Sequence, residues 1–247
     1  MSYSKDFYRD GFVNISLLED DCLSKLHSTI NDMNSKNISK GFLWEQKYQL
    51  TQDFRPTVFE YSSIFLDILF KNNIPKIVND ATQKQLFLAH IQLRRVFPGP
   101  SYMNWHRDTY YQNSDIVGTS PPGYKIIFFP EEVEENRSPC ISVVKGSHLC
   151  QNPQQLDTDM IMPGFSSFDQ QILRSNTFEN ITLKSSYNDF TFFNTSMLHA
   201  AEASTNPNGQ LRLIYVFVPE EQFKEKFESK PHHKNLNKIY QERLINE

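Results

Sequence analysis

The sequence predicts a mainly β protein, a double-stranded β-helix (jelly roll) with flanking N-terminal helices and a C-terminal helix. Helical patterns come first, and many short strand-like segments separated by Gly, Pro, Asn and Asp follow them, an order typical of a double-sheet fold with helices packed on one side. Those segments are rich in aromatic residues, which make up 13% of the chain and favour strands. Because 247 residues can bury a full core as one unit, we expect a single domain over residues 1–247.

The N-terminal part, residues 1–85, is predicted to be helical. Residues 16–19 match a capping box, in which a serine and a glutamate satisfy free backbone amides at a helix start. Apolar residues then recur at helical spacing, which predicts an amphipathic helix over 17–35. A second helix is expected from Pro56, because proline is favoured at the first helical position, to Lys71.

The jelly-roll core is predicted over residues 86–218. Its longest expected strand, 86–97, ends at a Pro-Gly-Pro turn. The segment 151–175 has few apolar anchors and is a candidate lid over the site. The highly charged segment 219–247, which includes His232-His233, is expected to be a solvated helix. The other expected strands span 124–129, 140–144, 181–184, 190–194 and 211–218.

Composition argues against several classes of protein. A formal charge of −4 gives no general attraction to nucleic acid or to acidic membranes. The three cysteines include no CxxC pair, so we expect reduced thiols in a cytoplasmic protein rather than a disulfide framework. The sequence has neither a leader-like start nor an apolar run of about eighteen residues, so neither export nor membrane insertion is expected.

Three residues have the pattern of a metal centre. His106 and Asp108 are two positions apart, so in a strand their side chains project from one face. His199 follows a predicted strand and supplies a third ligand. Two histidines and one carboxylate form the facial triad that binds non-haem Fe(II) and leaves positions open for a co-substrate and O2. We therefore predict that these three residues are the metal ligands and the catalytic residues.

Two alternatives compete with this metal site. Half-exposed strands often carry two polar residues by chance, in which case His106 and Asp108 form a surface pair and His199 is a hydrogen-bonded turn residue. Residues 106–113 also match the H-R-D-x-x-x-x-N motif of a protein-kinase catalytic loop. A kinase also requires a glycine-rich phosphate loop, a strand lysine and a D-F-G motif. The sequence lacks these, so we treat the match as a coincidence.

Several segments, in the same order, resemble the phytanoyl-CoA dioxygenase family of Fe(II)/2-oxoglutarate-dependent oxygenases. Two residues depart from the family pattern, since Lys145 replaces a proline and Asn188 replaces a glycine. Both are expected in loops, so the metal site is not affected. The segments that carry the resemblance are 6–13 (DFYRDGFV), 105–108 (WHRD), 139–148 (PCISVVKGSH), 186–193 (SYNDFTFF), 198–199 (LH) and Arg212.

The resemblance implies the cofactors and their contacts. Fe(II) is expected on the three predicted ligands, with 2-oxoglutarate as the co-substrate that chelates it. Arg212 falls where the family binds the remote carboxylate of 2-oxoglutarate, a role that suits a planar and permanently charged guanidinium. Further contacts to 2-oxoglutarate are expected from Tyr124 or Lys125 and from Gln92 or Arg94, with Tyr124 ranked first.

The function expected from this resemblance is hydroxylation of a small-molecule substrate with release of succinate and CO2. Asp108 supports this expectation, because related halogenases have a small residue at its position. Alternatives are desaturation or cyclisation, a non-catalytic jelly-roll binding module, and a cupin-type iron dioxygenase that does not use 2-oxoglutarate. A polar or anionic substrate is favoured by basic residues near the motifs, unless they only solvate the pocket rim: Arg94, Arg95, Arg107 and Lys145.

Overall fold

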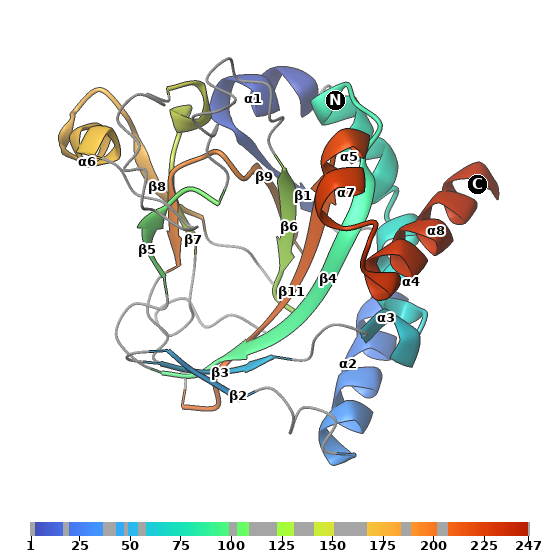
Figure 1. Cartoon of the computed structure of the whole chain (residues 1–247). Helices are drawn as coiled ribbons and strands as arrows, with labels where there is room; N and C mark the ends of the chain where they lie inside the picture. Colours follow the sequence, from blue (N-terminus) through green and yellow to red (C-terminus); the bar gives the residue numbers. More distant parts are fainter. Residues whose placement is uncertain are drawn as a thin grey trace.

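The computed structural model describes residues 3–16, 20–36, 43–46, 49–53, 58–98, 103–108, 123–130, 141–150, 167–183, 189–201 and 207–246. These residues form helices and two antiparallel sheets that face each other (Figure 1). The protein is therefore mixed α and β, and the expectation of a mainly β protein is not met. None of the described helices is long and apolar enough to cross a membrane.

The larger sheet has seven strands within the described residues, in the order β1-β9-β6-β11-β4-β3-β2. Its central strands, β4 and β11, are the longest and pair antiparallel along nearly their whole length. The strands of this sheet are β1 (Phe12–Ser16), β2 (Leu43–Gln46), β3 (Gln49–Asp53), β4 (Phe87–Val96), β6 (Tyr124–Phe128), β9 (Asp189–Asn194) and β11 (Gln210–Val218).

The smaller sheet has four strands within the described residues and faces the larger sheet (Figure 1). Its order is β5-β10-β7-β8, and its strands are β5 (Met103–His106), β7 (Ile141–Val144), β8 (Asn180–Leu183) and β10 (His199–Ala201). From β4 onward the chain passes repeatedly between the two sheets, with β4, β6, β9 and β11 in the larger and the intervening strands in the smaller. This topology is consistent with the jelly roll that the sequence predicts.

Helices cover the outer face of the larger sheet (Figure 1). α8 packs on β4, and α1 packs on α5. α6 lies apart from the others, beside the smaller sheet (Figure 1). The α-helices are α1 (Tyr3–Asp10), α2 (Asp20–Ser35), α3 (Val58–Tyr61), α4 (Ile64–Lys71), α5 (Ile74–Thr82), α6 (Ser167–Arg174), α7 (Glu220–Lys226) and α8 (Pro231–Asn246), and a short 3-10 helix, η3, spans Ser147–Leu149.

The alternation of β11 separates two apolar clusters. Its residues 211, 213, 215 and 217 are buried in the main core, together with apolar residues of α2, α4, α5 and α8. Successive strand residues point to opposite faces, so Arg212 and Ile214 face the smaller sheet. Ile214 packs there against a second cluster that includes Ile127 and Phe129. We call this side of the larger sheet its inner face.

The helical part of the sequence differs from the expectation in three ways. The helix expected over 17–35 is present as α2 from Asp20, and 17–19 lie outside the described residues. The helix expected from Pro56 to Lys71 is interrupted at Ser62-Ser63, so that α3 and α4 are separate. β2 and β3 lie within residues 1–85, because they extend the larger sheet beside β4.

The C-terminal segment is not a single solvated helix. It contains α7 and α8, and α8 buries one side that includes Leu236 and Tyr240. These two residues are four positions apart, so they lie on one face of the helix. The charged residues that dominate the segment occupy the other faces, which explains why its composition alone suggested full solvation.

Candidate metal centre

The three predicted ligands come together in the smaller sheet, where β5 ends and β10 begins. His106 ends β5, and His199 begins β10 directly opposite it in the antiparallel register. Asp108 follows two residues after His106, and its Oδ1 and Oδ2 lie 3.6 Å from His106 Nε2 and 3.3 Å from His199 Nε2. Each of the three residues offers one ligand atom, and these three atoms lie within 4.8 Å of one another. This spacing fits a single metal ion.

Backbone carbonyls fix the orientation of both imidazole rings. His106 Nδ1 lies 2.6 Å from the Asn104 carbonyl, and His199 Nδ1 lies 2.8 Å from the Met197 carbonyl. A carbonyl only accepts hydrogen bonds, so each Nδ1 must carry the proton and each Nε2 keeps its lone pair. Histidine metal ligands are typically held by such a hydrogen bond on the nitrogen that does not bind the metal.

Burial and charge favour the protonation states that a metal requires. Burial lowers the pKa of His199, although the carboxylate of Asp108 opposes this shift. Burial alone would raise the pKa of Asp108, but the ammonium of Lys125 holds it well below its ordinary value. A neutral His199 and an ionised Asp108 are the forms that bind a divalent cation.

Lys125 is the nearest basic neighbour of this carboxylate. It lies on the inner face of the larger sheet, and its Nζ donates a hydrogen bond of 2.7 Å to Asp108 Oδ2. From the sequence, Lys125 was expected near 2-oxoglutarate, but its contact with a metal ligand was not expected. Such a contact depends on the distance between two sheets, for which the sequence contains no local signal.

Arg107, between the two proximal ligands, is completely buried and points away from them. Its Nε donates to Asp169 Oδ1 of α6 at 2.8 Å, and both side chains are at most 1% exposed. Its other nitrogens donate to three backbone carbonyls, those of Ser147, Cys150 and Ser196. Arg107 is therefore not available to an anionic substrate, contrary to the sequence-based expectation.

The same contacts join the segments that carry the metal ligands. The Ser196 carbonyl that accepts from Arg107 lies three residues before His199. The hydroxyl of Ser147 accepts from the amide of Leu198, and the amide of Asp108 donates to the Thr195 carbonyl. The Arg107–Asp169 pair also attaches α6 to the segments that carry the metal ligands. α6 belongs to the segment 151–175, predicted to be a lid, of which residues 151–166 lie outside the described part.

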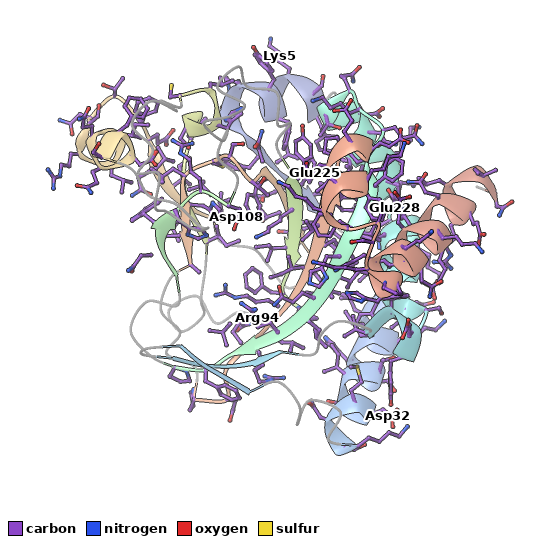
Figure 2. The ribbon with its side chains drawn as sticks, viewed as in Figure 1. Lys5, Asp32, Arg94, Asp108, Glu225 and Glu228 are labelled. Carbon is purple, nitrogen blue, oxygen red and sulfur yellow. The ribbon has the colours of Figure 1, made fainter. Side chains whose placement is uncertain are left out.

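Arg212 and Arg94 lie directly opposite each other on β11 and β4. Both are buried, and the guanidinium of Arg212 lies 5.8 Å from the centre of the Phe129 ring of the inner cluster. Gln92 is also buried and lies opposite Ile214, two residues along β11 from Arg212 in the direction of Val216, the partner of Lys125. Figure 2 shows Arg94 on the side of the larger sheet that faces the smaller sheet, where Asp108 also lies.

Tyr124 is placed elsewhere than beside the triad. Its ring lies 5.9 Å from Phe7 and 5.8 Å from Phe192, in the core between the larger sheet and α1. Adjacent strand residues face opposite sides, so Lys125 rather than Tyr124 projects inward. The ranking of Tyr124 above Lys125 as a contact of 2-oxoglutarate stays a prediction, and Lys125, not Tyr124, is the residue beside Asp108.

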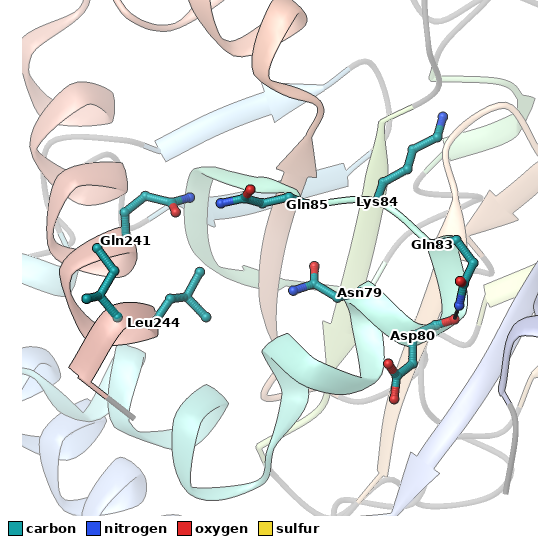
Figure 3. Close-up of a pocket in the computed structure, with 8 residues that line it drawn as sticks. Asn79, Asp80, Gln83, Lys84, Gln85, Gln241 and Leu244 are labelled. Carbon is teal, nitrogen blue, oxygen red and sulfur yellow. Dashed lines mark hydrogen bonds between the residues drawn. The ribbon is translucent and has the colours of Figure 1, made fainter.

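Other polar groups lie outside this centre. His233 is buried and its Nδ1 donates to the Ala89 carbonyl, and its ring is 5.4 Å from that of His90, so the solvated His232-His233 pair is not observed. A pocket of about 570 Å³ opens between α5 and α8 and is lined by polar residues such as Asn79 and Gln241 (Figure 3). Within the described residues, the triad is the one group of three or more candidate ligands.

The fold is shared with solved non-haem, α-ketoglutarate-dependent enzymes. The epimerase SnoN from nogalamycin biosynthesis, solved with Fe3+, α-ketoglutarate and nogalamycin RO, has a TM-score of 0.69 and 16% identity, over 88% of this chain and 82% of SnoN. The carbocyclase SnoK from the same biosynthesis has a TM-score of 0.65 and 13% identity, over 88% and 83%. HygX from Streptomyces hygroscopicus, with nickel and 2-oxoglutarate, has a TM-score of 0.58 and 14% identity, over 87% and 85%. No protein-family model and no curated protein sequence matches the chain.

Proposed function

We propose that this protein is an Fe(II)- and 2-oxoglutarate-dependent oxygenase with a jelly-roll core, related to the phytanoyl-CoA dioxygenases. The observation that carries the proposal is the geometry of the triad. His106 and His199 both direct an Nε2 lone pair toward the ionised Asp108, and this donor set is the one that non-haem Fe(II) oxygenases use. The shared fold of SnoN, SnoK and HygX supports the proposal.

His106, Asp108 and His199 would hold the metal, and a set of three protein ligands leaves coordination positions for the co-substrate and O2. Fe(II), 2-oxoglutarate and O2 together supply the oxidising power that converts the co-substrate to succinate and CO2 and oxidises a substrate C–H bond. The protein orients the ligands through the Asn104 and Met197 carbonyls. Buried apolar residues of the inner cluster exclude water around them.

Arg212 would bind the remote carboxylate of 2-oxoglutarate. It is buried on the inner face, where its fork can make two parallel hydrogen bonds to a carboxylate. Lys125 and Gln92 lie on the same inner face as Arg212, and Lys125 contacts Asp108 of the triad, so both are candidates for contacts along the co-substrate.

We propose hydroxylation of a small, polar or anionic molecule as the reaction, in a cytoplasmic protein that does not act on nucleic acid. SnoN is described as an epimerase and SnoK as a carbocyclase, so the outcome of C–H oxidation differs among proteins with this fold. The intact carboxylate of Asp108 supports hydroxylation here. Cys22 and Cys150 are free thiols, which suits a reducing compartment.

The test is anaerobic addition of Fe(II) and 2-oxoglutarate, followed by visible absorption. An oxygenase of this class develops a metal-to-ligand charge-transfer band. A non-catalytic binding module stays colourless, and a cupin-type dioxygenase binds iron but does not respond to 2-oxoglutarate. A screen of small acids and their conjugates for succinate release in air then identifies the substrate class.

A further inference from the structure

The residues next to the metal ligands face away from them, toward α6. Successive strand residues point to opposite faces, so Trp105 and Arg107 lie on the outer face of the smaller sheet. Leu198, the residue before His199, belongs with Ile172 of α6 to one buried apolar cluster. Trp105 packs against the same cluster. The apolar side of α6 is therefore buried behind both segments that carry metal ligands.

A polar contact joins α6 to the same two segments. Arg107 donates from Nε to Asp169 Oδ1 of α6 at 2.8 Å, and the same guanidinium donates to the Ser196 carbonyl. Both charged side chains are at most 1% exposed. A buried charge without its partner is strongly destabilising. The position of Asp169 therefore restricts Arg107, which lies between two metal ligands in the chain.

The triad needs a constraint of this kind. A metal site requires its ligands to be held within about 0.5 Å of the productive geometry. His106 and Asp108 belong to one segment and His199 to another, so the pairing of β5 with β10 must align them. β10 has only three residues, and its register with β5 is irregular between His199 and Ala201. Contact with α6 adds a second constraint to this short pairing.

We propose that α6 supports the metal centre from behind, with Asp169 and Ile172 as positioning residues that act through Arg107 and Leu198. This inference rests on the metal centre of the proposed function and gives α6 a role in it. Because α6 lies on the outer face of the smaller sheet, it backs the site rather than covering it. Docking of α6 and binding of the metal are then linked, so each favours the other by the same factor.

The first experiment measures hydrogen exchange of the α6 amides with and without Co(II), a redox-stable probe of the site. Loading with Co(II) should slow exchange in residues 167–174 about fivefold or more, the lower end of typical coupling between two sites. α7 is the internal control, because it packs on β4 of the larger sheet. Unchanged exchange in α6 at saturating Co(II) would overturn the inference.

The second experiment compares two isoleucine variants by Co(II) titration. Ile172→Ala removes the α6 side chain from the apolar cluster behind the ligands, whereas Ile64→Ala removes an α4 side chain from the main core. Both isoleucines are 4% exposed, so the two variants form a matched pair. Ile172→Ala should weaken Co(II) binding about fivefold or more, and Ile64→Ala should leave it unchanged.

Asp169→Asn adds a spectroscopic readout. The ligand-field absorption bands of Co(II) depend on the arrangement of the ligands around the ion. If Asp169 positions the triad, these bands should differ from those of the parent even when every site is filled. A residue that only stabilises the fold would not change the bands at saturation.

The outcomes separate this inference from the proposed function. If the parent binds Co(II) and Ile172→Ala binds it as tightly, or if Ile64→Ala weakens binding equally, α6 has no specific role and the proposed function stands. Parental bands in Asp169→Asn at saturation would remove Asp169 as a positioning residue. If the parent binds no Co(II), the metal centre is wrong, and the proposed function fails together with this inference.

Discussion

The ammonium of Lys125 and the carboxylate of Asp108 join the two sheets at the centre of the candidate metal site. Lys125 Nζ lies 2.7 Å from Asp108 Oδ2, although Lys125 belongs to the larger sheet and Asp108 follows a strand of the smaller one. The pair helps to keep the pKa of Asp108 low against the effect of burial. It therefore maintains an ionised metal ligand before any cation arrives.

Lys125→Met should tighten the binding of a divalent cation. An ammonium beside Asp108 repels the incoming metal, so its removal is expected to raise the affinity for Co(II) or Mn(II) about tenfold. The metal-free variant should lose about 1–3 kcal/mol of stability, because a partly buried carboxylate loses its partner. Isothermal titration and urea unfolding measure the two effects. Weaker metal binding would show instead that Lys125 mainly orients Asp108.

Replacement of His106, Asp108 or His199 by Ala should abolish stoichiometric metal binding and coupled turnover. The fold should persist, because the apolar clusters on both faces of the larger sheet do not include these residues. Metal content after loading and circular dichroism provide the two readouts. Replacement of His148 by Ala serves as a histidine control outside the triad. A triad variant with parental activity at limiting iron would remove that residue from the site.

The Arg107–Asp169 pair should behave as a buried ion pair. Asp169→Asn or Arg107→Met alone is expected to cost about 3–5 kcal/mol, because each leaves a buried charge without its partner. The double variant should cost less than the sum of the single ones. The partly exposed pair Arg243–Asp67 is the control, with a coupling of about 1 kcal/mol or less. Additive effects at Arg107 and Asp169 would contradict this account.

Arg212→Ala should weaken 2-oxoglutarate binding by about two orders of magnitude, since it removes a bidentate, charge-assisted contact. Arg212→Lys keeps the charge without the planar fork, so its loss should be intermediate. Metal affinity, measured separately without the co-substrate, should not change. Parental affinity of Arg212→Ala for 2-oxoglutarate would assign this arginine another role.

Stability should fall in acid partly because of His233. Burial, followed by the neighbouring His232, lowers the pKa of His233 to about 4, below the ordinary value of 6.5. The unfolded chain therefore binds more protons between these values. The stabilisation by neutral His233 is complete above pH 6.5 and is lost as the pH falls toward 4.

The test compares urea unfolding of the parent and of His233→Gln at pH 7.5 and pH 5. The parent should lose about 1–2 kcal/mol more than the variant over this interval. Since all other titrating groups are common to both proteins, the difference isolates His233. Equal losses would mean that His233 titrates normally in the folded protein.

Local patterns in the sequence predict much of the core. The strand expected over 86–97 is β4, and the strand expected over 211–218 is β11, because both are long and apolar with few interruptions. β5 and β10, which carry His106 and His199, were not predicted as strands. Each has at most four residues, too few for a recognisable alternation, and their pairing depends on contacts distant in sequence.

In the candidate site too, features set by neighbouring residues were predicted and features set by distant contacts were not. The spacing of His106 and Asp108 is local, so it was visible in the sequence, whereas the partners of Arg107 and Lys125 come from other parts of the chain. A basic residue beside a motif was interpreted as a substrate contact, although Arg107 is in fact enclosed by Asp169 and three carbonyls. The alternation that puts His106 and Asp108 on one face directs Arg107 to the other face, but a single sequence does not show which distant groups enclose it there.

The direct opposition of His106 and His199 has a consequence for the order of the smaller sheet. β5 is its edge strand within the described residues, and its register with β10 is irregular between His199 and Ala201. A metal ion bound by both histidines would act as a cross-link between this edge and the interior strand. Metal loading should therefore slow hydrogen exchange of the β5 amides more than that of β4, so that the cation completes the architecture of the sheet as well as its chemistry.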